Sequence, residues 1–286
     1  MTNGNSIINL GDLSKPANTL IEKISDAIGG IFKPLQIRRI AQAEAQADKI
    51  QAVAQIEISE LQHRALQRFL LEEAKKQNNI ESITQKALPS ISDHATPQNI
   101  EDDWITHFFD KCRLISDEQM QSLWSKILAG EANTPGRYSK RTVDIVSSLD
   151  KSDAELFSNL CCFGIQGQGL FPITPLVYDP DDNIYKDRHI NFGMLTHLDS
   201  IGLIQFDNIG GFVHREPEQK VQIQYDTERI WIEFKPSEKY EMQMGTVFLT
   251  KVGFQLSELC DVKPVDGFVA YLKEKWKSFG YTVVES

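Results

Sequence analysis

The feature that most constrains this chain is a run without Gly or Pro from Leu35 to Lys76. Such a run predicts one continuous α-helix, because Gly and Pro are the residues that most often end a helix. At about 1.5 Å per residue the helix would be roughly 60 Å long, far beyond the usual globular helix of about 11–12 residues. One compact domain cannot cover it. We therefore expect it to pack along a second subunit, a partner, or the later domains of its own chain.

An apolar stripe follows this run with a mean step of about 3.6 residues, which is typical of a nearly straight helix. Its members are Ile40, Ala43, Ala47, Ile50, Ala54, Ile58, Leu61, Ala65 and Phe69. Alanine dominates the first half of the stripe, so two helix backbones can approach closely there. We assign oligomerisation to the segment 35–88; a solvated lone helix is the alternative. The residues expected to carry it are Ile40, Ala47, Ile50, Ala54, Ile58 and Leu61.

A shorter amphipathic helix is predicted ahead of the long one. Residues 1–17 are polar and we expect them to be flexible. Thr19 and Glu22 form a capping-box pattern that opens a helix within 18–34, and Gly29 follows near its end. Its apolar face is a candidate membrane or partner contact. That face consists of Ile21, Ile24, Ile28 and Ile31. We prefer packing on a neighbouring helix, because the polar face lacks the lysines that anionic lipid attracts.

The segment 97–165 is predicted to be an all-helical bundle. Apolar residues recur at helical spacing around Trp104 and Trp124. Gly130 is expected to end a helix, and Pro135-Gly136 to form a turn before the next one.

The pattern changes after residue 164. Residues 164–184 are rich in Gly, Pro and Asp and are predicted to be a long connection. A helix, a short strand, a hairpin, a further strand, two helices and a terminal strand follow. These are Ile190–Ser200, the strand near Leu203, Val221–Tyr225 with Ile230–Phe234, Thr246–Leu249, Lys251–Cys260, Val265–Phe279 and Tyr281–Val284.

This order resembles a winged-helix domain over 185–286. The predicted fold class is therefore α+β, mainly α. It comprises a long N-terminal helix, a central helical bundle and a C-terminal winged-helix-like α+β module.

The charge of the chain disfavours nucleic acid as a partner. The formal net charge is -10. Residues 151–286 hold 13 Lys and Arg against 20 Asp and Glu, a balance of -7. The candidate recognition helix Ile190–Ser200 carries neither Lys nor Arg, and phosphate contacts need these cations. A winged fold used for protein contact is the preferred interpretation.

No sequence pattern assigns a catalytic, cofactor-binding or metal-ligating residue. The six histidines do not stand at zinc-ligand spacing. The Gly-rich stretch from Gly164 to Gly169 lacks the lysine of a phosphate loop. A nuclease-like pattern of Asp226, Glu233 and Lys235 is what alternating charges in a hairpin give by chance. We therefore expect a protein that is not an enzyme and needs no cofactor.

The cysteines and the N-terminus favour a cytoplasmic protein. Cys112, Cys161, Cys162 and Cys260 form neither a disulfide framework nor a C-x-x-C motif, so we expect reduced and mostly buried thiols. The N-terminal residues show no signal pattern, and no stretch approaches the roughly 18 apolar residues of a membrane span. Association with a membrane surface stays open.

Two stretches, residues 29–50 and 115–160, resemble an uncharacterised bacterial family, the domain of unknown function numbered twenty-eight-zero-six. The second stretch is the more specific; residues 191–206 and 246–259 resemble the family's C-terminal part. The residues that carry the match are Trp124, the run Leu128-Ala-Gly-Glu131, Pro135, Gly136, Ser139 and Arg141-Thr142. From the residues themselves, Trp124 is expected in the core. Glu131, Arg137 and Arg141 are expected to pair and hold the loop between two helices.

The chain is also distantly similar to the Abi-alpha abortive-infection family, which implies a role in bacterial defence against phage. Three functions follow from the sequence. The first is a self-associating defence protein whose C-terminal module recognises a partner, with a phage or host protein as trigger. The second is a membrane-active effector that inserts its N-terminal helix. The third is a winged-helix regulator that binds nucleic acid.

Overall fold

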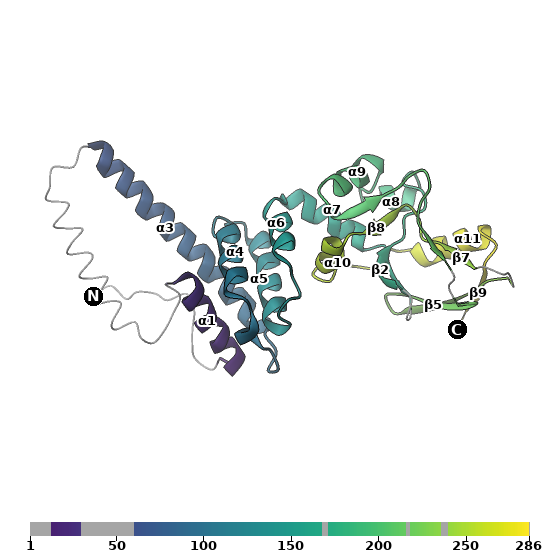
Figure 1. The fold of residues 1–286 in the computed structure, drawn as a ribbon. Helices are drawn as coiled ribbons and strands as arrows, with labels where there is room; N and C mark the ends of the chain where they lie inside the picture. The colour runs from purple at the N-terminus through teal and green to yellow at the C-terminus, as the bar shows by residue number, and fades with distance from the viewer. Residues whose placement is uncertain (1–12, 30–59, 168–170, 216–217, 236–239, 286) are drawn as a thin grey trace. The chain divides into compact units, whose positions relative to one another are not determined.

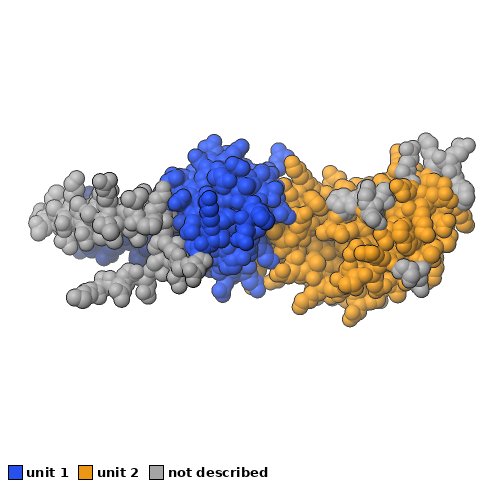
Figure 2. Space-filling model, turned by 90° about the horizontal axis from the view of Figure 1, so that it is seen from below, with its two compact units in different colours: residues 1–147 blue, residues 148–286 orange. Residues whose placement is uncertain are grey.

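The structure is a computed structural model of the 286-residue chain, and it describes residues 13–29, 60–167, 171–215, 218–235 and 240–285. The chain divides into two compact units, residues 1–147 and 148–286, which Figure 2 shows in different colours. The boundary falls inside the segment 97–165 that the sequence groups as one bundle. The fold class is α+β and mainly α, as expected.

Unit 1 consists of helices in its described part (Figure 1). The α-helices are α1 (Lys15–Ile28), α3 (Glu60–Ala87), α4 (Asp102–Cys112), α5 (Glu118–Asn133) and α6 (Lys140–Ser147), with the 3₁₀ turns η1 (Leu88–Ser90) and η2 (Pro97–Asn99). Aromatic rings fill the centre. Trp104 stacks on Phe108 at 5.0 Å between ring centroids, and Phe108 meets Trp124 edge-on at 5.1 Å. The prediction that Trp124 lies in the core is confirmed, because its side chain is 0% exposed.

Helix α3 is half in this core and half outside it. Buried residues begin at Asn79 and continue to Ala87, on the part that packs against α5. The Asn79 amide donates to the Arg113 carbonyl at 2.9 Å, and the Gln121 amide donates to the Ile115 carbonyl at 2.9 Å. The predicted helix is therefore present from residue 60 and runs on past Lys76. Its expected first part, residues 35–59, lies outside the described residues.

Helix α1 begins four residues before the predicted cap. Ser14 is the N-cap, and its Oγ accepts the Ala17 N–H at 3.3 Å. Thr19 lies inside the helix, where its hydroxyl donates to the Lys15 carbonyl at 3.1 Å. The expected capping box at Thr19 is wrong, because Pro16 in the first turn already fits a helix start at Lys15. Gly29 ends the helix with a φ of 71°.

Unit 2 carries nine described strands and five helices. The helices are α7 (Lys151–Cys161), α8 (Asn183–Lys186), α9 (Phe192–Ser200), α10 (Lys251–Ser257) and α11 (Phe268–Ser278). The strands are β1 (Gly164–Gly167), β2 (Phe171–Pro175), β3 (Ile204–Phe206), β4 (Val213–Arg215), β5 (Lys220–Tyr225), β6 (Glu228–Glu233), β7 (Glu241–Gln243), β8 (Val247–Leu249) and β9 (Thr282–Glu285).

The main sheet is antiparallel, with the strand order β2-β1-β5-β6-β9. The predicted hairpin is confirmed as β5 and β6, with Ile223 opposite Ile230. The expectation of a connection over 164–184 is wrong for its first part. There β1 pairs with both β2 and β5, placing Gln166 opposite Gln224.

Helix α11 supplies the apolar residues that pack on the main sheet. Phe268, Leu272 and Trp276 are 0% exposed. The Phe268 ring lies 5.0 Å from the ring of Tyr225 on β5. The alternation along β5 buries Val221, Ile223 and Tyr225 and leaves the residues between them more exposed. One face of the hairpin therefore belongs to the core of unit 2.

The predicted winged-helix module stays a prediction. Helix α9 leads into β3, β3 pairs with β8, and β8 leads into α10. The chain between β3 and β8 forms β4 to β7 and sends β5 and β6 into the main sheet.

Gly253 gives a direct test of this packing. A Cβ atom on Gly253 would lie 1.9 Å from the carbonyl oxygen of Leu203, so α10 can approach this backbone only with a glycine there. We expect Gly253→Ala to lower the stability of unit 2 by about 2 kcal/mol or more, although alanine ordinarily favours a helix. The matched control is Gly193→Ala in α9, where the nearest atom is 3.5 Å away. Calorimetry of the full chain should show a lower unfolding temperature for Gly253→Ala and an unchanged one for Gly193→Ala. Equal unfolding temperatures of the two variants would contradict this packing.

Candidate functional site

The exposed part of α3 is the first candidate site. Four large apolar side chains on it are exposed to solvent: Leu61 (69%), Phe69 (57%), Leu70 (50%) and Leu71 (72%). The arm, which we define as residues 60–78 of α3, contains no buried residue. Leu61 and Phe69 lie on the predicted stripe, whereas Leu70 and Leu71 point to other sides of the helix, because consecutive residues are about 100° apart. Several large apolar side chains exposed on one helix indicate a site that binds another protein or a membrane.

Two ion pairs along the arm join residues four apart on the helix. Arg64 lies 3.7 Å from Glu60, and Arg68 lies 3.7 Å from Glu72. Such pairs add a few tenths of a kcal/mol each to helix stability. The arm is therefore a charged helix that also displays leucine and phenylalanine.

Of the predicted oligomerisation residues, the structure places Leu61 alone. Ile40, Ala47, Ile50, Ala54 and Ile58 lie outside the described residues. Leu61 lies at the start of the arm, where its side chain is largely exposed.

The predicted membrane or partner face of α1 lies inside unit 1. Ile21 is 3% exposed and Ile24 is 0% exposed, and the helix packs against α4 and η2. Lys23 forms an ion pair with Asp102 on α4. Ile28 is half-buried, and Ile31 lies outside the described residues. The face is therefore used for packing, and a membrane contact would require α1 to leave the bundle.

The residues of the family motif build the loop between α5 and α6. The Glu131 side chain is 2% exposed, and its carboxylate accepts the N–H groups of Gly136 at 2.6 Å and Tyr138 at 2.9 Å. The expected pairing of Glu131 with Arg137 and Arg141 stays a prediction. The backbone N–H groups of the turn reach the buried carboxylate directly.

The other motif residues shape the same loop. Pro135 and Gly136 form the predicted turn, in which Gly136 has a φ of 87°. Ser139 directly precedes α6 and its Oγ accepts the Thr142 N–H at 3.2 Å, while Arg141 is exposed. Gly130 does not end α5. It lies within that helix, and a Cβ there would come 2.7 Å from the Tyr138 ring. The motif residues therefore shape the loop between α5 and α6 and pack it against the helical core of unit 1.

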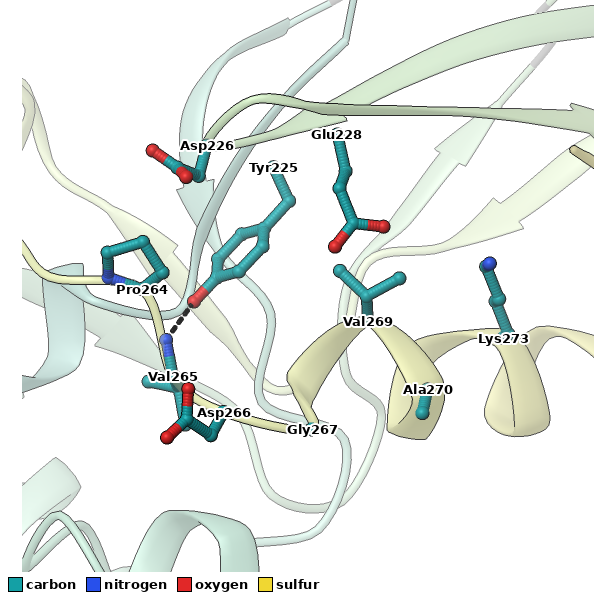
Figure 3. A pocket seen from close by; sticks show the side chains of 10 residues that line it. All are labelled: Tyr225, Asp226, Glu228, Pro264, Val265, Asp266, Gly267, Val269, Ala270 and Lys273. Carbon is teal, nitrogen blue, oxygen red and sulfur yellow. Dashed lines mark hydrogen bonds between the residues drawn. The ribbon is translucent and has the colours of Figure 1, made fainter. Parts of the chain in front are cut away.

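A hollow of about 400 Å³ in unit 2 is the second candidate site (Figure 3). It lies between the β5–β6 turn and the start of α11. Its lining is Tyr225, Asp226, Glu228, Pro264, Val265, Asp266, Gly267, Val269, Ala270 and Lys273.

Tyr225 fixes the geometry of the hollow. Its hydroxyl accepts the Val265 N–H at 2.7 Å and donates to the Cys162 carbonyl at 2.8 Å. Burial raises the pKa of this phenol, so the hydroxyl keeps its proton at neutral pH. The tyrosine thus joins β5, the end of α7 and the approach to α11.

Three carboxylates surround the hollow at separate points. Figure 3 shows Asp226 and Asp266 to the left with Pro264 between them, and Glu228 to the right above Val269. Asp226 accepts a long hydrogen bond of 3.4 Å from the Thr227 hydroxyl, and no partner for Glu228 or Asp266 is found among the described residues. No group of three His, Cys, Asp or Glu in the described part of the chain could hold a metal ion.

Sequence reasoning missed this hollow. Asp226 and Glu228 belong to the hairpin turn, whereas Asp266 and Lys273 come from the segment around α11. Two signals were available, the short polar turn Asp226–Arg229 and Gly267 ahead of a helix, but neither predicts that the two segments meet. Asp226 itself adopts a left-handed backbone with a φ of 49°, which is uncommon outside glycine.

The cysteines are thiols in the structure, as predicted. Cys112, Cys161 and Cys162 are buried and Cys260 is half-buried. Burial raises the pKa values of Cys112 and Cys161 well above the ordinary range, so these thiols stay protonated and unreactive at neutral pH.

A family model described as "Protein of unknown function (DUF2806)" matches residues 63–273. This chain belongs to the DUF2806 family. The match starts within the arm, contains the motif loop around Glu131 and ends at Lys273, which lines the hollow of unit 2. No curated protein and no solved structure matches the chain. None of the helices in the described part of this DUF2806 protein is long and apolar enough to cross a membrane.

Ile24 tests the assignment of α1 to the core of unit 1. Burying an unpaired carboxylate costs several kcal/mol, so Ile24→Asp should detach α1 and make residues 13–29 a target for limited proteolysis. Glu22→Gln changes a charge on the exposed face of the same helix and should leave the digestion pattern unchanged. Equal digestion of both variants would show that α1 does not depend on this contact.

Glu131 generates a pH-dependent prediction. Burial raises the pKa of its carboxyl, although the loop N–H groups oppose the shift. A carboxyl with a raised pKa in the folded state contributes most to stability below its ordinary pKa, and that contribution is lost as pH rises through the folded value. Relative to Glu131→Gln, the wild type should therefore gain stability as pH falls from 7 towards 4. Amide hydrogen exchange of residue 134 and residues 136–139 in both proteins measures this, and a difference independent of pH would contradict it.

Proposed function

We propose that this DUF2806 protein is a non-enzymatic, self-associating protein in bacterial defence against phage, with unit 2 as its protein-recognition module. The observation that carries the proposal is the arm, a helix that displays Leu61, Phe69, Leu70 and Leu71 to solvent. Burying one such side chain contributes about 1.5–3 kcal/mol, so pairing two arms offers a large gain in free energy.

A second copy of the chain is the partner that the arm fits best. The arm contains the four basic residues Arg64, Arg68, Lys75 and Lys76 and the three acidic residues Glu60, Glu72 and Glu73. This near-neutral balance avoids repulsion between identical arms, and each arm offers both signs of charge to the other. An arm of one sign would favour a partner of the opposite charge instead.

The defence role rests on the similarity to the Abi-alpha abortive-infection family, with its tryptophan-bearing helix in a central bundle. In this chain Trp124 lies on α5, where its side chain is buried in the core of unit 1. The trigger would be a phage or host protein bound by unit 2. We place the protein in the cytoplasm.

The two other functions receive less support. A membrane-active effector would have to expose Ile21 and Ile24, which now fill the contact between α1 and α4. A nucleic-acid regulator would need cations on α9, and that helix carries neither Lys nor Arg.

Charge placed on the arm should dissociate the assembly. In the Phe69→Glu, Leu70→Glu variant, two carboxylates would enter the proposed interface, and an unpaired buried charge costs several kcal/mol. Size exclusion with light scattering should give a wild-type mass that is a multiple of 32.5 kDa and a variant mass of 32.5 kDa. Both proteins should show the same helix content, because the altered side chains are exposed and such changes alter stability by less than about 0.5 kcal/mol.

The matched control adds the same two charges at exposed polar positions of unit 1 outside the arm. Gln98→Glu with Gln119→Glu should keep the wild-type mass, since both glutamines are exposed and lie outside residues 60–78. A wild-type protein of 32.5 kDa at every concentration would refute self-association.

A further inference from the structure

The hollow of unit 2 combines apolar walls with negative charge. Val269 is half-buried and Ala270 exposed on α11, and Pro264 lies ahead of that helix. Asp226, Glu228 and Asp266 contribute three carboxylates against the single ammonium group of Lys273. Since Glu228 and Asp266 have no partner in the described chain, their charges are available to a ligand.

The spacing of these carboxylates decides which cation fits. They do not come together as a group that could hold one metal ion. Figure 3 shows them at separate points of the rim, with apolar side chains between. A ligand that satisfies them needs several donors on an extended frame and an apolar stem.

We propose that this hollow binds an arginine side chain of a partner protein. A guanidinium group carries five N–H donors in a planar fork, so it can contact carboxylates on more than one element. Its aliphatic stem would lie along Val269 and Ala270. Lysine offers one compact charge and should bind more weakly.

Two further features of unit 2 suit this ligand. The balance of -7 over residues 151–286 attracts a basic partner before contact. Tyr225 anchors the hollow through hydrogen bonds to Val265 and Cys162, so the site is formed before the ligand arrives.

The proposal deepens the partner-recognition role of unit 2 and rests on that part of the proposed function. Self-association through the arm does not depend on it. Light scattering of every variant therefore reports on the arm, whereas ligand binding reports on the hollow.

The test uses the full chain and blocked tripeptides as probes. Acetyl-Gly-Arg-Gly-amide should shift the NMR signals of residues 225–228 and 264–270, and higher salt should weaken its binding. The same peptide with citrulline in place of arginine keeps the shape but loses the charge. It should bind about tenfold more weakly or not at all, because hydrogen bonds between charged groups are stronger than those of a neutral donor.

Variants of the protein locate the binding. Glu228→Gln with Asp266→Asn should weaken the arginine peptide about tenfold. The control, Asp199→Asn with Glu218→Gln, removes the same net charge at exposed positions outside the hollow and should bind like the wild type. Equal affinity of the two double variants, equal binding of the citrulline peptide, or shifts confined to other residues would each overturn the proposal. If the binding results contradict the proposal while the arm variants still dissociate as expected, the assignment of the hollow is wrong and self-association stands.

Discussion

The contact between the second half of α3 and α5 is the constraint on which the rest of unit 1 depends. Buried residues on α3 begin at Asn79. The side-chain amide of Asn79 donates a hydrogen bond to the Arg113 carbonyl, which joins the helix to the end of α4. The first turn of a helix is costly to form, but here the core already supplies that nucleus and the arm only extends it. The arm is thus ordered by residues that lie outside it. Its leucines and phenylalanine stay exposed because the core ends before reaching them.

Unit 2 is organised by a different contact. Tyr225 connects the hairpin to the segments on either side of it in sequence, through Cys162 at the end of α7 and Val265 before α11. This leaves the turn residues and the start of α11 facing one another across the hollow, which gives unit 2 its candidate recognition site. Unit 1 would thus carry the surface for self-association, and unit 2 the site that recognises a partner.

The sequence predicts well those elements whose cause is local. The helical period of α3, the alternation in β5 and β6 and the turn at Pro135 all follow from neighbouring residues. The sequence predicts poorly those elements that form only through contact with a distant segment. Strand β1 forms in a Gly-rich stretch because Gln166 pairs with Gln224, almost sixty residues away. The Glu131 carboxylate accepts backbone N–H groups, since the turn folds back onto it, and the hollow of unit 2 forms from two segments that no pattern links. The sequence predicts Gly130 as a helix end, but Gly130 lies within α5. A glycine is required there because the Tyr138 ring leaves no room for a Cβ atom.

The central claim, that the arm binds another arm, is tested most directly by photo-cross-linking from the arm itself. A benzophenone amino acid in place of Leu70 in the full chain would react with whatever side chain lies against it in the cell. The account predicts a product with twice the mass of one chain, whose joined peptides both come from residues 60–78. The same group in place of Gln85, beyond the arm, should not give that product. Cross-links from position 70 only to other proteins, or none at all, would contradict the account.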